Sequence, residues 1–287
     1  ALAQQPCQVD KLKLEACILY ANSDDNQASI LLESARQLRP RDASIHFELG
    51  FCYHGLQEFQ KAIDCYTSAL ELNYHRTFVV LANRANCLFR KNRTDEALAD
   101  LEASLRISPH YELALRTRAF VNAHLGNAEL AYKDYSTIIE HASGPKVISD
   151  AYCNRAFCFG DVDEVDIQNS RLADPTNPEP VRYIASALIN DGHVAEAIAQ
   201  MTEWLIENPT HKDRAYQYSF RAEMYASISD WENGINDYKE AIKIMMNSTA
   251  QLNYVACAVP ETLQTYNDRL NQLILGRDEH LAAMQRL

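Results

Sequence analysis

Small residues recur along this chain at nearly constant intervals. One series comprises Ala16, Gly50, Ala85, Ala119, Ala156, Ala185 and Ala222, and a second comprises Ala28, Ala62, Ala97, Ala131, Ala197 and Gly234. The early steps in both series are 34 or 35 residues long. Because two independent series share this period, the chain is predicted to be an array of repeats.

The stretch 43–76 shows the repeating unit most clearly. Its small and apolar residues fall at helical spacing in two sets, which the turn Gly55–Glu58 separates: His46, Leu49, Gly50 and Tyr53, then Ala62, Tyr66 and Ala69. Gly50 and Ala62 are small where two helices must cross closely, and Tyr53 and Tyr66 fill the space beside them. Each unit is therefore predicted to be a helical hairpin.

The order Leu49-Gly50-x-x-Tyr53 followed by Ala62-x-x-x-Tyr66 resembles the tetratricopeptide repeat (TPR) family. His46 stands where that family usually has Trp, and Tyr74 stands where it has Pro. The resemblance covers roughly residues 9–248. It implies an all-α fold, a right-handed superhelical solenoid of about seven TPR-like hairpins with a C-terminal capping helix.

The chain is expected to divide into a TPR array over residues 1–248 and a capping segment over 249–287. The array comprises units near 9–42, 43–76, 78–111, 112–145, 149–177, 178–211 and 215–248. The unit at 149–177 is irregular, because its second half is too short for a full turn and helix, so a compressed second helix is expected. In the capping segment, 261–275 is predicted to form an amphipathic helix that breaks at Gly276. Its apolar face carries Leu263, Tyr266, Leu270 and Leu273.

Charged residues follow the same period. Arg84, Arg118 and Arg221 each precede a small residue of the first series, and Asp100, Asp134 and Asp237 lie 16 residues further on. Since the two helices of a hairpin pack together, these positions should meet. Each of the three hairpins is predicted to contain one internal Arg–Asp pair with a structural role.

Composition limits the partners and the compartment. A net charge of -12 argues against sequence-independent binding to nucleic acid or to an anionic membrane surface. No apolar run approaches the roughly 20 residues of a membrane span, and ALAQQPCQ does not resemble a signal peptide. The 8 cysteines include several at helix-packing positions and form no C-x-x-C pair, so reduced structural thiols and a cytoplasmic location are expected.

Catalytic motifs are absent from the sequence. It contains no glycine-rich phosphate loop, no H-E-x-x-H pair and no serine elbow. The acidic run at 161–166 lacks the glycine and the distal glutamate of a calcium loop, and reads as a solvated turn. We therefore expect a protein that is not an enzyme and that carries neither a cofactor nor a metal ion.

The first helices of the hairpins carry the informative signal. Their inner-wall positions include aromatic residues, and exposed aromatics on a concave surface are typical of a binding site. In the TPR family, Asn at the place of Asn83 and Asn154 often holds the backbone of an extended peptide. Arg116 and Arg182 could pair with a carboxylate. The expected peptide-binding residues are Phe47, Phe51, Asn83, Arg116, Phe120, Asn154, Phe157, Arg182 and Tyr183.

These features favour a non-catalytic scaffold or adaptor that binds a peptide or helix of a partner protein in its concave groove. The positions aligned with the family's clamp for the acidic tails of heat-shock chaperones do not complete that clamp, so a more apolar ligand is expected. Two alternatives stay open. The array could be the substrate-recruiting arm of a larger enzyme, or a dedicated chaperone for a secreted or membrane client.

Overall fold

The computed structural model describes residues 5–22, 24–159, 162–251 and 259–284. Within these ranges the chain forms fifteen α-helices joined by turns, and no β-strand. The protein is an all-α repeat solenoid, as the sequence predicts. The helices cluster into two compact units, which are described separately: residues 1–147 with 154–162, and residues 148–153 with 163–287.

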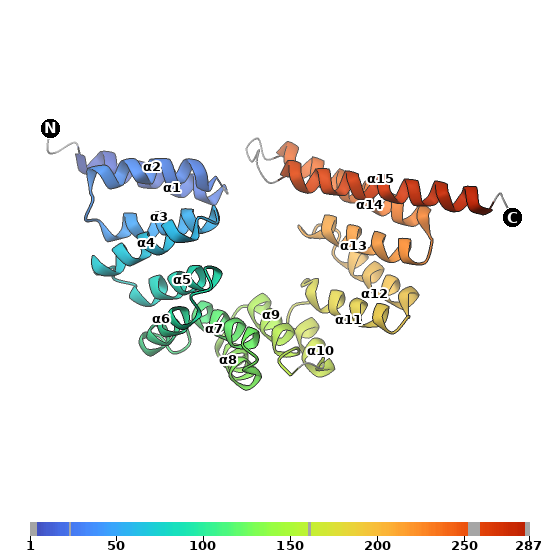
Figure 1. Ribbon diagram of the computed structural model, residues 1–287, viewed down its shortest axis with the longest axis horizontal. Helices are drawn as coiled ribbons and strands as arrows, with labels where there is room; N and C mark the ends of the chain where they lie inside the picture. Colours follow the sequence, from blue (N-terminus) through green and yellow to red (C-terminus); the bar gives the residue numbers. More distant parts are fainter. Residues whose placement is uncertain (1–4, 23, 160–161, 252–258, 285–287) are drawn as a thin grey trace. The chain divides into compact units, whose positions relative to one another are not determined.

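The first unit contains four consecutive hairpins (Figure 1). Within each hairpin the two helices pack together, and the second helix of one hairpin packs against the first helix of the next. The first helices α3, α5 and α7 also contact one another in sequence. Its helices are α1 (Gln5–Ala21), α2 (Asp25–Leu38), α3 (Ala43–Gly55), α4 (Phe59–Glu71), α5 (Thr77–Arg90), α6 (Thr94–Ile107), α7 (Glu112–His124) and α8 (Ala128–His141).

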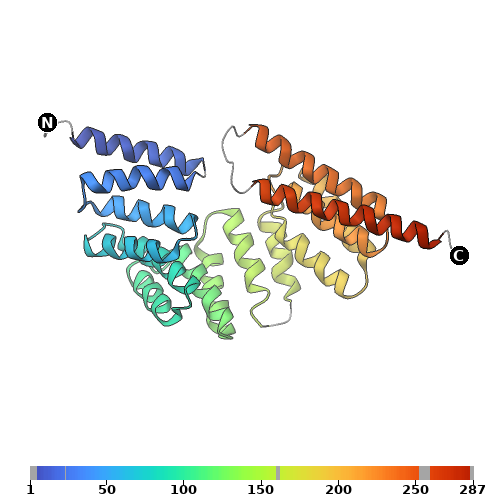
Figure 2. The same cartoon turned by 45° about the horizontal axis from the view of Figure 1, so that its top comes forward.

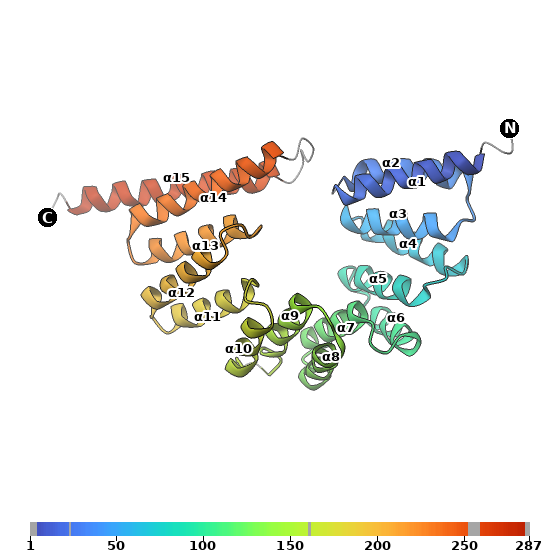
Figure 3. The same ribbon diagram turned by 180° about the vertical axis from the view of Figure 1, so that it is seen from behind.

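The second unit contains the later hairpins. The pairs α11–α12, α13–α14 and α14–α15 pack together, and α10 packs on α11 (Figures 2 and 3). Its helices are α10 (Glu164–Ala173), α11 (Glu179–Asn190), α12 (Val194–Glu207), α13 (Arg214–Ser227), α14 (Trp231–Gln251) and α15 (Val259–Met284). The helix α9 (Pro145–Arg155) contributes residues to both units.

The turns inside the α3–α4, α5–α6 and α7–α8 hairpins are closed in the same way. The first residue beyond the turn donates its backbone N–H to a carbonyl five residues earlier, as in Glu58 N to Tyr53 O and Arg93 N to Leu88 O, both at 2.9 Å. Just before each donor stands a residue with positive φ, Gln57 or Asn92 in these two turns and a glycine, Gly126, in the next. This left-handed residue satisfies the last carbonyls of the helix and reverses the chain.

The core of the α3–α4 hairpin contains one close approach. Gly50 and Tyr66 are both buried, and a Cβ atom built on Gly50 would lie 2.6 Å from Cε1 of Tyr66. The tyrosine ring therefore occupies the space that any larger residue at position 50 would need. This geometry explains why the repeat alternates small and aromatic residues.

The three predicted Arg–Asp pairs are confirmed. In each pair both carboxylate oxygens accept hydrogen bonds from one guanidinium, at distances of 2.7 or 2.8 Å. The pairs are Arg84–Asp100, Arg118–Asp134 and Arg221–Asp237, and all three aspartates are buried. Two of the arginines also reach the preceding hairpin, since Arg84 donates to Thr67 and Arg221 donates to Thr202.

The irregular hairpin has the compressed second helix that the sequence predicts, because α10 contains only 10 residues. Ser149 on α9 and Ser170 on α10 hydrogen-bond each other, and Asn177 donates to Ser149. A small buried polar network thus joins α9 to α10, beside buried apolar residues such as Ala151 and Ile167.

The C-terminal helix caps the second unit. Tyr266 and Leu273 are buried against α13 and α14, and Leu270 packs beside them. Leu263, the fourth predicted member of this face, lies outside the described side chains. The predicted break at Gly276 is wrong, because α15 continues to Met284. The ring of Trp231 lies close to Gly276, so the glycine provides close packing rather than a helix end. The division into an array over 1–248 and a cap over 249–287 stays a prediction.

Candidate functional site

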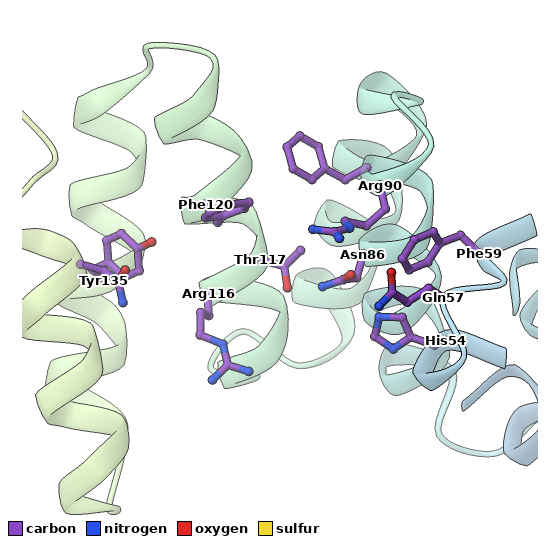
Figure 4. Close-up of a pocket in the computed structure, with 11 residues that line it drawn as sticks. His54, Gln57, Phe59, Asn86, Arg90, Arg116, Thr117, Phe120 and Tyr135 are labelled. Carbon is purple, nitrogen blue, oxygen red and sulfur yellow. The ribbon is translucent and has the colours of Figure 1, made fainter. Parts of the chain in front are cut away.

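A pocket of about 440 Å³ opens among the helices of the first unit. The side chains that line it come from the helices α3, α4, α5, α7, α8 and α9 and from the turn between α3 and α4 (Figure 4). They are His54, Gln57, Phe59, Asn86, Phe89, Arg90, Arg116, Thr117, Phe120, Tyr135 and Asn154. Three of the residues predicted from sequence, Arg116, Phe120 and Asn154, therefore lie together.

Phenylalanine rings form the apolar part of this pocket. Phe120 on α7 is 46% exposed, although it is a large aromatic residue. Its ring lies edge-on to Phe89 of α5, with centroids 5.8 Å apart, and 4.5 Å from the ring of His124. Phe59 forms a further apolar surface at the start of α4, beneath the guanidinium of Arg90 at 5.4 Å. The pocket thus offers aromatic rings from three consecutive hairpins, on α4, α5 and α7.

Polar side chains lie between these rings. Asn86 and Arg90 project from α5 toward Thr117 on α7 (Figure 4). Asn154 on α9 is exposed at the pocket. Amide and hydroxyl groups can both donate and accept hydrogen bonds, so this wall suits a peptide backbone or a polar side chain.

Electrostatics differ between the pocket's basic groups. Burial lowers the pKa of His54 below its usual range, and nearby Arg90 lowers it further, while a hydrogen bond with Asn86 acts in the opposite direction. His54 is therefore a neutral imidazole at neutral pH. The permanent positive charges of the pocket are those of Arg90 and Arg116.

A second, apolar pocket of about 250 Å³ lies between α1, α2 and α3 in the same unit. Phe47 and Phe51, both predicted from sequence, line it together with Tyr20. The rings of Tyr20 and Phe51 meet edge to face at 5.1 Å, and Phe47 stacks on Tyr74 at 4.8 Å. These contacts hold the two phenylalanines in a partly buried aromatic cluster.

The structure does not place the remaining predicted residues at these pockets. Asn83 is buried, and its Nδ2 donates to the carbonyl of Val79 in its own helix at 2.8 Å. It therefore stabilises α5 and does not present its amide to a ligand. Phe157 is half-buried and is not part of either pocket lining. Arg182 and Tyr183 lie on α11 in the second unit, where the guanidinium of Arg182 lies 4.7 Å from the ring of Tyr216.

Sequence reasoning missed several lining residues that share a register. Asn86 directly follows the small residue Ala85, as Phe51 and Phe120 follow theirs. His54 and Phe89 both stand four residues after the small residue of their helix. The positions one and four residues after the small residue recur in every first helix. The repeat alignment could therefore have identified these lining residues.

Other site chemistries find no support in the described part of the chain. Among those residues, no group of three or more His, Cys, Asp and Glu side chains could hold a metal ion. Burial raises the pKa of the Cys52 and Cys87 thiols to about 12 and that of Cys65 to about 11, so these thiols are not nucleophiles at neutral pH. None of the described helices is long and apolar enough to cross a membrane.

Consecutive hairpins with first helices in register define the class of helical repeat proteins. Residues 41–110 match the family model described as tetratricopeptide repeat. A crystal structure of a tetratricopeptide repeat protein from Parabacteroides merdae aligns with 90% of this chain and 98% of its own, with a TM-score of 0.60 and 20% identity. The fold is therefore that of tetratricopeptide repeat proteins, and residues 41–110 match this family.

A second solved structure shows the same fold. The APC/C hetero-tetramer Cut9–Hcn1 aligns with 72% of this chain and 41% of its own, with a TM-score of 0.57 and 14% identity. At these identities the two likenesses establish the fold alone. Tetratricopeptide repeats form scaffolds for protein–protein interaction, and that is the class of function that the match over residues 41–110 implies.

Curated relatives share only part of their length with this chain. Serine/threonine-protein phosphatase T from Trypanosoma brucei brucei is 28% identical over 46% of this chain and 27% of the relative. The peroxisomal targeting signal receptor of Saccharomyces cerevisiae is 27% identical over 42% of this chain and 19% of the relative. The BBSome complex member BBS4 of Mus musculus is 30% identical over 39% and 21%, respectively. The chain thus spans about a quarter or less of each of these relatives.

Proposed function

We propose that the chain is an adaptor that binds a segment of a partner protein in the pocket lined by α3, α5, α7 and α9. The observation that carries this proposal is the exposure of Phe120, which keeps 46% of its surface open beside Arg116 and Asn154. An aromatic side chain left open in a hollow with polar neighbours is typical of a binding site.

The fold supports a peptide ligand. Tetratricopeptide repeat proteins bind protein or peptide partners, and one relative is a targeting signal receptor. A partner segment could lay its apolar side chains on Phe120 and Phe89, while Asn154 and Asn86 hydrogen-bond its backbone. In this proposal Asn154, Arg116 and Phe120 act as one site, and Asn83 acts only within α5.

The apolar pocket at Phe47 and Phe51 is a second anchor in the same unit. Its lining is almost entirely apolar, so it suits a leucine-sized or aromatic side chain of the partner. In the second unit we propose Arg182 and Tyr183 as a separate contact surface. The guanidinium of Arg182 lies over the ring of Tyr216, which is 46% exposed on α13.

The partial match to a phosphatase favours one alternative. In that alternative the repeats recruit substrates for a catalytic part outside this sequence. A catalytic motif in the flanking coding sequence would support it, and a flanking sequence without one would exclude it. We place the protein in the cytoplasm, where its free thiols, among them Cys52, Cys65 and Cys87, would stay reduced.

Selection of peptides from a random library tests the proposed site. A display library of twelve-residue peptides would be selected on the wild-type protein, and the enriched peptides would then be measured by fluorescence anisotropy. Phe120→Ala should weaken their binding about tenfold or more, because central interface aromatics commonly contribute about 2 kcal/mol or more.

The matched control is Phe159→Ala. Phe159 is 60% exposed in the same unit but does not line the pocket. This variant should bind like the wild type, and both variants should keep the wild-type melting temperature. Enriched peptides that bind the Phe120→Ala variant as tightly as the wild type would refute this site.

A further inference from the structure

The pocket is positively charged, whereas the protein as a whole is negatively charged. The chain carries a net charge of -12, yet none of the eleven side chains that line the pocket is an aspartate or a glutamate. Two of them are arginines, Arg90 and Arg116. A basic pocket in an acidic protein indicates a ligand that carries negative charge.

Arg90 is available for such a ligand. In the part of the chain that the structure describes, its guanidinium makes no ion pair and no hydrogen bond, and it lies over the face of the Phe59 ring at 5.4 Å. A guanidinium has five N–H donors in a planar fork that matches a carboxylate. The contact with the Phe59 ring uses none of these N–H donors.

Arg116 is held only weakly. Among the described residues its one ion-pair partner is Glu112, one turn earlier on α7, at 3.3 Å, and the two side chains are 49% and 39% exposed. Exposed pairs of this spacing contribute little, so a ligand carboxylate can replace Glu112 at small cost. Both arginines lie next to open rings, Arg90 above Phe59 and Arg116 one turn before Phe120.

Resting on the function proposed above, we propose that the pocket recognises an acidic internal segment of a partner protein. A side-chain carboxylate of that segment binds the edge of Arg90, and a neighbouring apolar side chain lies on Phe120. Asn86 and Thr117 stand between these two places and supply hydrogen bonds to the intervening backbone. The ligand is therefore an alternation of acidic and apolar residues.

Three peptides that share the apolar residues of a selected sequence test this proposal. They carry Asp and Glu, Asn and Gln, or Lys at the polar positions, and all have amidated C-termini. Binding is measured by fluorescence anisotropy on the wild-type chain. The acidic peptide should bind about tenfold or more tightly than its Asn/Gln counterpart, since hydrogen bonds to charged groups are worth about twice those between neutral groups.

Variants at Arg90 assign the effect to this site. Arg90→Gln should reduce the preference for the acidic peptide, and Arg90→Glu should bind the Lys peptide better than the wild type does. Arg106→Glu is the control, because it makes the same change of charge on α6 at a residue that does not line the pocket. It should leave the preference for the acidic peptide unchanged, and the melting temperature of each variant would show that it folds.

Different results would contradict the proposed binding site and the proposed acidic ligand. Selected peptides that depend on Phe120 but are neutral or basic would overturn the acidic ligand and leave the binding site standing. Acidic peptides that bind only with a free C-terminal carboxylate would overturn recognition of an internal segment. A selection that enriches no peptide dependent on Phe120 would overturn the proposed function and, with it, this inference.

Discussion

Arg118 donates two parallel hydrogen bonds to the carboxylate of Asp134, from Nε at 2.8 Å and from Nη2 at 2.7 Å. This contact joins α7 to α8 within one hairpin. The Asp134 side chain is only 4% exposed, while Arg118 keeps 29% of its surface open. The hydrogen bond with Asp134 raises the pKa of Arg118, so the arginine keeps its charge under all ordinary conditions.

A double-mutant cycle should therefore show strong coupling between Arg118 and Asp134. Arg118→Ala leaves a buried carboxylate without its two donors, so the single variant should lose more stability than the pair contributes. The coupling free energy from urea denaturation should be about 1 kcal/mol or more. The control is Arg93–Glu96, which has the same two-bond geometry at the surface. Its coupling should be much smaller, and equal coupling for the two pairs would contradict the role of burial.

Gly50→Ala should destabilise the first unit by about 1–3 kcal/mol, because overpacking a filled core forces side chains out of their preferred rotamers. The new methyl group would lie 2.6 Å from Cε1 of Tyr66, whose ring is fully buried. Helix propensity acts the other way, since alanine is favoured over glycine by roughly 0.5–1 kcal/mol. Thermal denaturation would measure the difference.

The same substitution in a Tyr66→Leu background isolates the clash. Without the ring, Gly50→Ala should be neutral or stabilising, because only the helix propensity is left. If Gly50→Ala is equally harmful in both backgrounds, the contact with Tyr66 is not its cause.

The sequence predicted the helical hairpins and their internal ion pairs, because both follow from the repeat period. Arg118 and Asp134 could be paired in advance because both stand at fixed distances from a small residue of the hairpin. The same repeat alignment gave Asn83 and Asn154 equivalent positions and one peptide-binding role, and for Asn83 this prediction is wrong. Asn83 bonds to Val79 inside α5, whereas Asn154 lies near the end of α9, the first helix of the irregular hairpin, and is exposed.

The open pocket could be predicted only in part. Phe120 and Arg116 lie on first helices, where a repeat pattern identifies the inner wall. Gln57 and Phe59 belong to a turn and to the start of a second helix. These two residues reach the pocket because the chain reverses tightly at Gln57, which has a positive φ. No residue pattern predicts a positive φ at a glutamine. Pocket residues that a turn supplies can therefore be identified only from the structure.

His54 should make the stability of the protein depend on pH. Burial lowers its pKa from the ordinary value of 6.5, so the unfolded chain binds a proton more readily than the folded chain does. Stability should therefore fall as the pH drops below that ordinary value. Replacing His54 by Gln removes this term, so His54→Gln should lose less stability than the wild type between about pH 7.5 and about pH 5.5.

Urea denaturation of both proteins at the two pH values would measure this difference. A surface histidine provides the control, and His193→Gln suits it because that side chain is 65% exposed. His193→Gln should follow the wild type across the range. An identical loss of stability in the wild type and in His54→Gln would show that His54 is as easily protonated in the folded protein as in the unfolded chain.

Asn83→Ala and Asn154→Ala should have opposite effects, although both residues stand two positions before the small residue of their helix. Asn83 is 5% exposed and donates to Val79 O, so its loss should lower the melting temperature and spare peptide binding. Asn154 lines the open pocket, so its loss should weaken an extended peptide and leave the melting temperature nearly unchanged. Differential scanning fluorimetry and anisotropy would separate the two effects.

An extended ligand exposes its backbone amides, whereas a helical ligand pairs them internally, so only the extended ligand should bind the Asn154→Ala variant more weakly. Weakened binding in the Asn83 variant alone, at unchanged stability, would reverse the assignment of the two asparagines.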